Sequence, residues 1–308
     1  MKIMKFEVTI LGCSAAFPAN GLFTTSQVLN INDQYFLIDC GEGCQIRLRE
    51  YHIKYSKINH IFISHVHGDH ILGLPGLLGS FGLLGRKKAL HIHCPEGVKD
   101  FFEAFIQYTN VRKMEYPIHF HVYQSDEPII ILETNEIIVT TIPLKHDAPT
   151  AGFLFQEKER PRNMIKEKIK EYEIPFQEIL NIKNGMDFIL PNGQIVPNSE
   201  LTKAALSARS YAFCSDTAYN ETMLPLIDKV DLLYHESTFG DEKLEDLKER
   251  NIHSTARQAG TIAQKAAVKK LIIGHFSPRY KDLNVLLRQA KEVFPNTELA
   301  LDGTKFKI

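Results

Sequence analysis

The feature that most constrains this chain is the run IFISHVHGDH at residues 61–70, where an apolar stretch gives way to a dense polar group. The apolar part is typical of a buried β-strand, which we predict over His60–Ser64. Four potential metal ligands follow it: His65, His67, Asp69 and His70. In a loop after a strand, the first two can point the same way, while the last two face a second position. Imidazole and carboxylate groups together suit zinc, with manganese or iron as alternatives.

Four ligands cannot complete two metal sites. The rest of the chain offers three more potential ligands, each just after a predicted strand. His146 follows a predicted strand over Glu136–Leu144, Asp216 follows one that ends at Ser215, and His275 follows one that ends at Gly274. Taken alone, each of these residues is more often a turn or cap residue. As a set of seven, they predict a two-metal site.

Apolar and alternating segments recur along the whole chain, with helical segments between them. Strands are predicted at Phe6–Leu11, Gln27–Ile31, Tyr35–Asp39, His60–Ser64, Leu90–Cys94, Glu136–Leu144, Gly152–Phe155, Tyr211–Ser215, Leu232–His235, Leu271–Gly274 and Glu298–Leu301. The clearest helices are Gly97–Tyr108, Asp282–Val293 and Thr255–Lys269, the last with capping-box spacing between Thr255 and Gln258. This mixture indicates an α/β fold.

Composition narrows the class of protein further. The 308 residues, 44% of them hydrophobic, suffice for one large domain or two modest ones with a substantial core. A net charge of −1 excludes a uniformly basic surface, so contact with nucleic acid requires a local patch. The alternation over Phe6–Ile10 indicates a strand rather than a signal peptide, and no window approaches the ~20 apolar residues of a membrane span. We expect a soluble cytoplasmic protein whose five cysteines, none in a CxxC pair, are buried free thiols.

One segment, Glu157–Gly193, differs from its surroundings because it is charged and interrupted by proline and Asn-Gly turns. Its first part carries six basic residues against three acidic ones: Lys158, Arg160, Arg162, Lys166, Lys168 and Lys170 against Glu157, Glu159 and Glu167. We interpret it as an insertion that projects from the core. The plainer alternative is a solvated surface helix and loop.

The metal-ligand run is similar to that of the metallo-β-lactamase superfamily, and further motifs resemble one family within it. These motifs are LGCSAAFP at 11–18, DCGE at 39–42, GLPGLLGS at 73–80, HESTF at 235–239, HST at 253–255 and HFSPRY at 275–280. They look like those of ribonuclease Z, the tRNA 3′-processing endonuclease, and the likeness runs from about residue 6 to residue 303.

The resemblance implies a fold and a ligand set. It implies an αββα metallo-β-lactamase sandwich as a single domain over residues 1–308, with a flexible arm at 156–195 that binds tRNA away from the cleavage site. The first zinc would be held by His65, His67, His146 and Asp216. The second would be held by Asp69, His70, Asp216 and His275, so that Asp216 bridges the two ions.

The resemblance also implies an activity, the removal of the 3′ trailer from precursor tRNA, leaving a 3′-hydroxyl on the tRNA and a 5′-phosphate on the trailer. Asp69 is the family's catalytic base. For the acid that protonates the leaving oxygen we predict His253, oriented by Glu236. The alternative for His253 is a residue that merely precedes the Thr255 helix cap.

The remaining predictions concern the residues that contact RNA and those that contact a second subunit. Substrate contacts are predicted at Arg279, Ser277, Phe17, Lys158, Arg160 and Arg162. The insertion departs from the family at Arg162, where a glycine is common, and after Pro175, where a Gly-Pro pair is missing. The apolar segment Ile71–Arg86 is a buried helix, part of a homodimer interface, or both.

Two rival functions are compatible with parts of this pattern. The first is another hydrolase of the superfamily, a phosphodiesterase or arylsulfatase-like enzyme that acts on small substrates and generally lacks the arm. The second is a non-catalytic RNA-binding protein, which the complete set of seven ligands disfavours.

Overall fold

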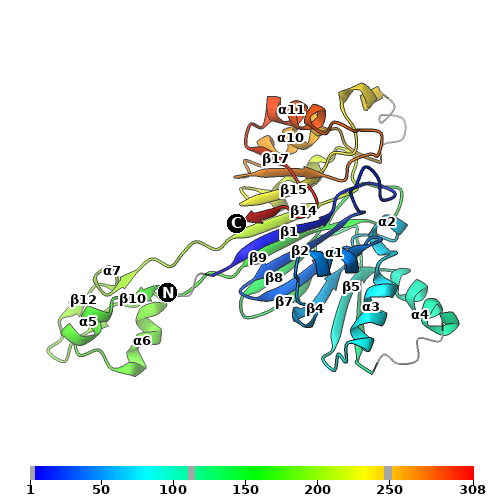
Figure 1. The fold of residues 1–308 in the computed structure, drawn as a ribbon. Helices are drawn as coiled ribbons and strands as arrows, with labels where there is room; N and C mark the ends of the chain where they lie inside the picture. Colours follow the sequence, from blue (N-terminus) through cyan, green and yellow to red (C-terminus); the bar gives the residue numbers. More distant parts are fainter. Residues whose placement is uncertain (1–3, 110–114, 246–251) are drawn as a thin grey trace. The chain divides into compact units, whose positions relative to one another are not determined.

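The computed structural model describes residues 4–109, 115–245 and 252–308, and the chain divides into two compact units. The larger unit comprises residues 1–156 and 209–308 and contains two seven-stranded sheets (Figure 1). The first sheet has the order β18-β1-β2-β3-β4-β5-β6. Its strands are β1 (Phe6–Gly12), β2 (Ser26–Ile31), β3 (Gln34–Ile38), β4 (Ile58–Phe62), β5 (Leu90–Pro95), β6 (Ile118–Tyr123) and β18 (Lys305–Lys307).

The second sheet has the order β17-β16-β15-β14-β9-β8-β7. Its strands are β7 (Ile130–Glu133), β8 (Ile137–Pro143), β9 (Ala151–Glu157), β14 (Ser210–Cys214), β15 (Leu232–Glu236), β16 (Leu271–Gly274) and β17 (Thr297–Leu299). Strands β3 to β6 run parallel to one another, as do β14 to β17.

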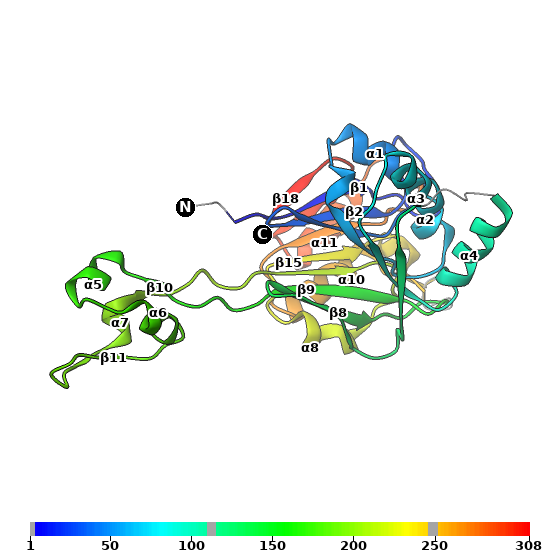
Figure 2. The same cartoon turned by 90° about the horizontal axis from the view of Figure 1, so that it is seen from below.

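Helices cover the outer faces of both sheets (Figure 2). Those of the first sheet are α1 (Cys44–Glu50), α2 (Gly68–Ile71), α3 (Leu74–Leu83) and α4 (Val98–Thr109), with the 3₁₀ turn η1 (Tyr55–Lys57). Those of the second sheet are α8 (Leu224–Ile227), α10 (Ala256–Lys265) and α11 (Asn284–Val293), with η2 (Glu221–Met223) and η3 (Asp241–Lys243). The order helix, sheet, sheet, helix confirms the predicted αββα fold.

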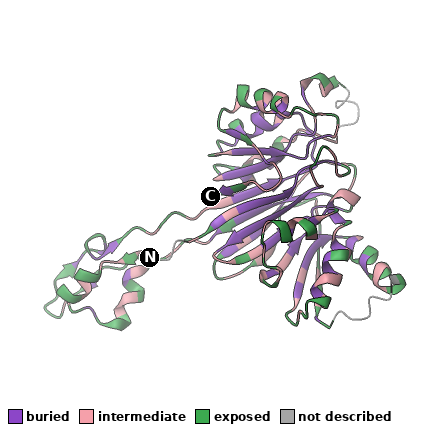
Figure 3. Cartoon of the chain, viewed as in Figure 1, coloured by how far each residue is buried: buried purple, intermediate pink, exposed green. Residues whose placement is uncertain are grey.

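Successive side chains along the strands point to opposite faces of each sheet, and the buried ones form two hydrophobic cores. Both sheets are buried through most of their length (Figure 3). Phe62 of β4 packs with Phe153 and Phe155 of β9 between the sheets. Leu90 and Ile92 of β5 belong to a second core under α1, α3 and α4. Because successive strand side chains point to opposite faces, one strand serves both layers.

Several predicted boundaries need correction. The strand before the metal-ligand run ends at Phe62 rather than Ser64, because Ser64 leaves the ladder and its backbone N–H donates to Asp39. The predicted helix to Lys269 ends at Lys265. Its capping box is confirmed, with Thr255 and Gln258 each bonding the other's backbone N–H.

The smaller unit comprises Glu157–Ala208. It contains short strands β10 (Asn163–Met164), β11 (Phe188–Ile189), β12 (Ile195–Val196) and β13 (Thr202–Lys203), and helices α5 (Lys166–Glu171), α6 (Phe176–Lys183) and α7 (Asn198–Leu201). Its own small core includes Ile182, Phe188 and Leu201. Its bounds extend past the predicted arm at 156–195, because the segment through Leu201 closes that core.

Five histidines form a cluster on neighbouring strands, away from the metal-ligand run: His60, His91, His93, His119 and His121. Register places His60 beside His91, and His91 beside His119. His60 Nδ1 lies 3.2 Å from His93 Nε2, and His91 Nδ1 lies 2.9 Å from His121 Nε2. Burial, followed by the charge of neighbouring imidazoles, lowers the pKa of His60 to about 4 and that of His93 to about 3. The rings of His60 and His93 therefore stay neutral near pH 7.

The five cysteines are free and buried, as predicted. No helix in the described ranges is long and apolar enough to cross a membrane.

Within Ile71–Arg86, helix α3 buries Leu74, Leu77, Leu78 and Phe81, whereas Leu83 is 88% exposed and Leu84 is 68% exposed.

Candidate metal centre

Four loops that follow strands carry the seven predicted ligands to one place. His65 to His70 follow β4, His146 follows β8, Asp216 follows β14 and His275 follows β16. Each loop leaves a buried strand, so the backbone positions of the polar side chains are fixed by the two cores beneath them.

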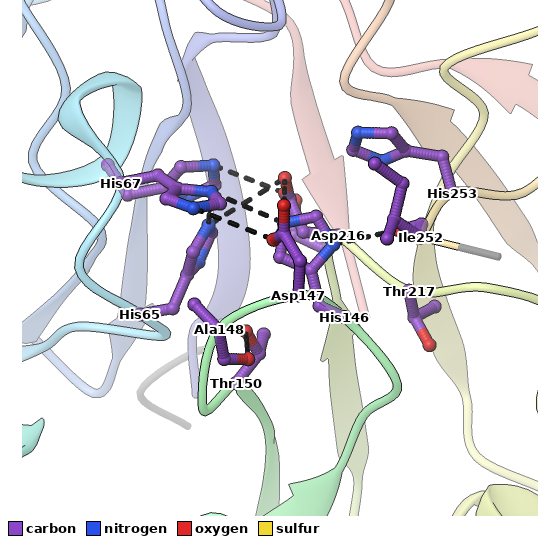
Figure 4. Close-up of polar contacts among 12 residues, drawn as sticks. His65, His67, His146, Asp147, Ala148, Thr150, Asp216, Thr217, Ile252 and His253 are labelled. Atoms are coloured by element: carbon purple, nitrogen blue, oxygen red, sulfur yellow. Dashed lines mark hydrogen bonds and ion pairs between the residues drawn. The ribbon is translucent and has the colours of Figure 1, made fainter. Parts of the chain in front are cut away.

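One group of ligand atoms comes from His65, His67, His146 and Asp216 (Figure 4). His67 Nδ1 lies 3.1 Å from His65 Nε2 and 3.2 Å from His146 Nε2. The Oδ2 atom of Asp216 lies 3.8 Å from the Nε2 atoms of both His65 and His146. Three imidazole nitrogens and one carboxylate oxygen are a ligand set that divalent zinc accepts.

A second group comes from Asp69, His70 and His275 and also meets Asp216. The Oδ1 atom of Asp216 lies 3.1 Å from His70 Nε2 and 3.2 Å from His275 Nε2. Asp69 Oδ2 lies 3.6 Å and 3.4 Å from the same two nitrogens. The two oxygens of Asp216 therefore face different groups, which is the geometry of a bridging carboxylate.

Hydrogen bonds at Nδ1 fix how three of the histidines present Nε2. His70 Nδ1 lies 2.7 Å from Asp39 Oδ2, His146 Nδ1 lies 2.8 Å from the Ile252 carbonyl oxygen, and His275 Nδ1 lies 2.8 Å from Thr238 Oγ1. An Nδ1–H that donates leaves the Nε2 lone pair free for a metal.

The buried Nε2 atom of His70 lies 3.1 Å from Asp216 Oδ1, but no described residue is placed at an angle that makes a hydrogen bond with it. An orphaned imidazole nitrogen in a fully buried position fits a metal ligand, because a bound cation would satisfy its lone pair. The donor set and this orphaned atom together make the site suited to divalent metal ions.

Backbone conformation at the site is uncommon. Asp39, Asp216 and His275 all have left-handed backbone, with φ of 55°, 40° and 57°. Such conformations cost free energy in residues other than glycine and persist where the surroundings impose them. Here each one turns the chain at the end of a strand and aims a polar side chain inward.

Asp69 is held by the first loop of the chain. Its Oδ2 atom accepts a 2.7 Å hydrogen bond from the backbone N–H of Ala16. Burial raises the pKa of Asp69, but the charges of His70 and His275 outweigh it, so the pKa is lower than usual. Asp69 is therefore ionised at neutral pH.

His253, which is partly buried, and Glu236, which is fully buried, form a pair at the edge of the metal-ligand cluster. His253 Nδ1 lies 2.9 Å from Glu236 Oε1, which also accepts from the backbone N–H of Thr217 at 2.7 Å. Burial lowers the pKa of His253, but the Glu236 charge raises it more, to about 9. His253 therefore holds a proton at neutral pH, and its ring lies 5.1 Å from that of His146, centroid to centroid.

The ligand residues open into a cavity of about 350 Å³. Three predicted substrate-binding residues, Arg279, Ser277 and Phe17, line it together with Phe239. Phe17 is 58% exposed, and the Arg279 guanidinium carbon lies 4.9 Å from the centroid of the Phe239 ring. An aromatic surface beside a cation suits a nucleotide.

The other predicted substrate contacts, Lys158, Arg160 and Arg162, lie in the smaller unit. Arg160 forms a 2.5 Å ion pair with Glu157, and Arg162 Nε donates to Thr202 Oγ1 at 2.6 Å. Two of the basic side chains counted in the sequence therefore already bond to residues of the smaller unit itself.

Sequence reasoning assigned no role to Asp39, Thr238 or Asp147. Asp39 directly follows β3, as the assigned ligands follow their own strands, and this pattern could have identified it. Thr238 bonds both Glu236 Oε2 and His275 Nδ1, a link that no spacing indicates. Asp147 Oδ1 lies 3.0 Å from His146 Nε2 and 3.6 Å from His67 Nε2.

Known proteins resemble this chain over nearly its whole length. Residues 6–294 match the model of a protein family described as Anti-Pycsar protein Apyc1. The chain is 47% identical over 299 residues to the ribonuclease Z of Bacteroides thetaiotaomicron, covering 97% of this chain and 94% of that protein. It is 46% identical over 304 residues to the ribonuclease Z of Phocaeicola vulgatus, covering 99% and 98%.

Solved structures show the same arrangement. Human tRNase Z, short form, is similar with a TM-score of 0.68 and 25% identity, covering 97% of this chain and 98% of that one. A metallo-β-lactamase fold protein from Bacillus subtilis has a TM-score of 0.69 at 19% identity, covering 99% and 100%, which shows the fold alone.

Proposed function

Because the chain belongs to the ribonuclease Z family, and to the family described as Anti-Pycsar protein Apyc1, we propose that it is a metal-dependent endoribonuclease that removes the 3′ trailer from precursor tRNA. The observation that carries the proposal is the convergence of His65, His67, His146, Asp69, His70 and His275 on the two oxygens of Asp216.

The finer proposal is that the centre holds two zinc ions. The first would be held by His65, His67, His146 and Asp216, and the second by Asp69, His70, Asp216 and His275. The support is that Asp216 presents a different oxygen to each group. Two divalent cations here would acidify a water molecule and neutralise charge that develops on the phosphate oxygens.

The chain's own residues supply the rest of the reaction. Asp69, ionised and fixed by the Ala16 amide, accepts the proton of the attacking water and orients it. As water adds to phosphorus, the P–O3′ bond breaks. His253 donates its proton from Nε2 to the leaving 3′-oxygen, while Glu236 holds Nδ1. The products are a tRNA with a 3′-hydroxyl and a trailer with a 5′-phosphate.

Substrate selection is assigned to residues beyond the metal ligands. Phe17, Ser277 and Arg279 lie where the nucleotides flanking the cut would enter the cavity. We assign the smaller unit, with Lys158, to the body of the tRNA. A homodimer is also proposed, because Leu83 and Leu84 expose an apolar surface at the end of α3.

The test is cleavage of a precursor tRNA with a short 3′ trailer, with the cut mapped to the nucleotide. Asp69→Ala should lose cleavage, whereas the matched variant Asp126→Ala, at an exposed loop position, should retain it. Metal analysis of the wild type should give two zinc ions per subunit. If the wild type holds its metal and hydrolyses bis(p-nitrophenyl) phosphate but leaves the RNA intact, the tRNA assignment is wrong.

A second variant tests the smaller unit. Replacing residues 160–190 with a short Gly/Ser loop should abolish cleavage of precursor tRNA and spare hydrolysis of the small diester. Intact RNA cleavage in this variant would favour a hydrolase of small substrates and contradict the role given to this unit.

A further inference from the structure

A basic groove lies in the larger unit at the amino ends of two neighbouring strands. It has a volume of about 730 Å³, and its lining includes Leu84, which also belongs to the proposed dimer surface. Its basic lining residues are Arg49, Lys54, Lys57, Arg86, Lys87 and Lys88, and none of the described residues that line it is acidic. Residues 54–57 lead into β4 and residues 86–88 lead towards β5, which runs parallel to β4. We call this feature the amino-end groove.

Most of the charge in the amino-end groove is not neutralised. Lys87 pairs with Glu115 at 2.6 Å, and Lys57 lies 3.6 Å from Asp33. Arg49, Lys54 and Lys88 are exposed, and in the part of the chain that the structure describes no carboxylate forms an ion pair with them. In a chain whose net charge is only −1, this is a local concentration of positive charge.

Arg86 gives the groove a fixed cation. Its guanidinium donates to three backbone carbonyl oxygens at 2.7–2.8 Å and to the Asn59 side chain at 3.0 Å. Its central carbon lies 5.2 Å from the Phe81 ring centroid and 5.6 Å from that of Tyr116. All of these partners are neutral, so they hold the side chain in place without cancelling its charge.

The aromatic wall beside this cation is also rigid. Tyr55 meets Phe81 edge-on, with ring centroids 5.9 Å apart, and its hydroxyl donates to the Gln45 carbonyl oxygen at 2.7 Å. A preformed groove with a fixed cation loses little conformational entropy when it binds an anion.

We propose that the amino-end groove binds backbone phosphates of the RNA substrate. This inference rests on the proposed function and extends it. The metal-ligand loop leaves the carboxyl end of β4, while the groove lies at its amino end, and the five residues of this strand span about 17 Å. Only an extended polyanion can occupy both places at once, so the groove should matter for RNA and not for a small diester.

The experiment compares the double variant Lys54→Gln/Lys88→Gln with the matched variant Lys291→Gln/Lys305→Gln, which removes two exposed lysines from α11 and β18. For each zinc-loaded enzyme, kcat and KM for precursor tRNA are measured at several salt concentrations. Each lysine–phosphate interaction that is lost should lower the slope of log KM against log salt by about 0.7–0.9. The double variant loses two, so its slope should fall by about 1.4–1.8, which corresponds to a KM raised roughly 25-fold to 60-fold at 0.1 M salt. The kcat value should stay close to that of the control.

Two further measurements separate the alternatives. Hydrolysis of bis(p-nitrophenyl) phosphate reports whether each variant retains a folded metal centre, and sedimentation velocity reports its oligomeric state. A rise in KM at unchanged sedimentation supports the groove. A double variant with the KM and salt slope of the control overturns it, as does a rise in KM that appears only with a change in sedimentation. A wild type that does not cut precursor tRNA refutes the proposed function instead, before any variant is compared.

Discussion

Replacing His93 with Phe should make the stability of this protein less sensitive to acid. His93 belongs to the five-histidine cluster and stacks on Phe62, with ring centroids 4.6 Å apart. A phenyl ring retains that stacking and removes the titrating group. The magnitude follows from the pKa of each histidine in the folded and unfolded chain.

An unfolded histidine titrates near pH 6.5. In the folded protein, burial and then neighbouring imidazoles lower the pKa of His60 to about 4 and that of His93 to about 3. Between these values and pH 6.5, unfolding takes up protons, so stability is complete above pH 6.5 and falls as the pH drops. At pH 5 each of these histidines should cost about 2 kcal/mol relative to pH 7.5.

The assay is urea unfolding of wild type and His93→Phe at pH 7.5 and pH 5, with metal content held equal. The quantity compared is the decrease in unfolding free energy between the two pH values, which should be about 2 kcal/mol smaller in the variant. Any effect common to both proteins, including metal release in acid, cancels in this difference. An equal decrease in both proteins would refute the reasoning, whatever the variant does to stability at pH 7.5.

Three further predictions concern the metal centre. His253→Ala should lower kcat for precursor tRNA by about 10²–10⁴-fold with little change in KM, and a change confined to KM would contradict its role as the acid. Thr238→Val should weaken metal affinity about 10–100-fold in a chelator competition, because it removes the hydroxyl that holds His275 Nδ1; Thr238→Ser should restore it. Chelation should abolish cleavage and lower Tm, since bound metal stabilises the folded state, and added zinc should restore both; an unchanged Tm would argue against the site.

Much of the fold was predictable because its signals are local. The apolar stretch before His65 and the spacing of Thr255 and Gln258 predicted a strand and a helix start that the structure contains. Strand β18 gave no such signal. Lys305–Lys307 is short and mostly charged, and it becomes a strand only because it pairs with β1 near the other end of the chain.

The candidate site, like the fold, was predictable from the sequence only in part. Its residue types and their places after strands were evident from sequence, and the pairing of His253 with Glu236 was predicted from the chemistry of a carboxylate–histidine pair. The contacts that orient the ligands were not. Asp39 bonds His70 across 31 positions of the chain, and Thr238 bonds His275 across 37. Partners so distant carry no periodic signal, because only the packed sheets bring them together.

The sequence by itself determined which side chains stand at the ends of which strands, because alternation and apolar runs reflect short-range geometry. Only the tertiary structure decided that the loops after β4, β8, β14 and β16 meet, and that one oxygen of Asp216 faces His65 while the other faces His70. It also placed the amino-end groove opposite the metal ligands on β4. The physical reason is that these arrangements depend on how two sheets pack, and that packing is set by burial of side chains distant in sequence.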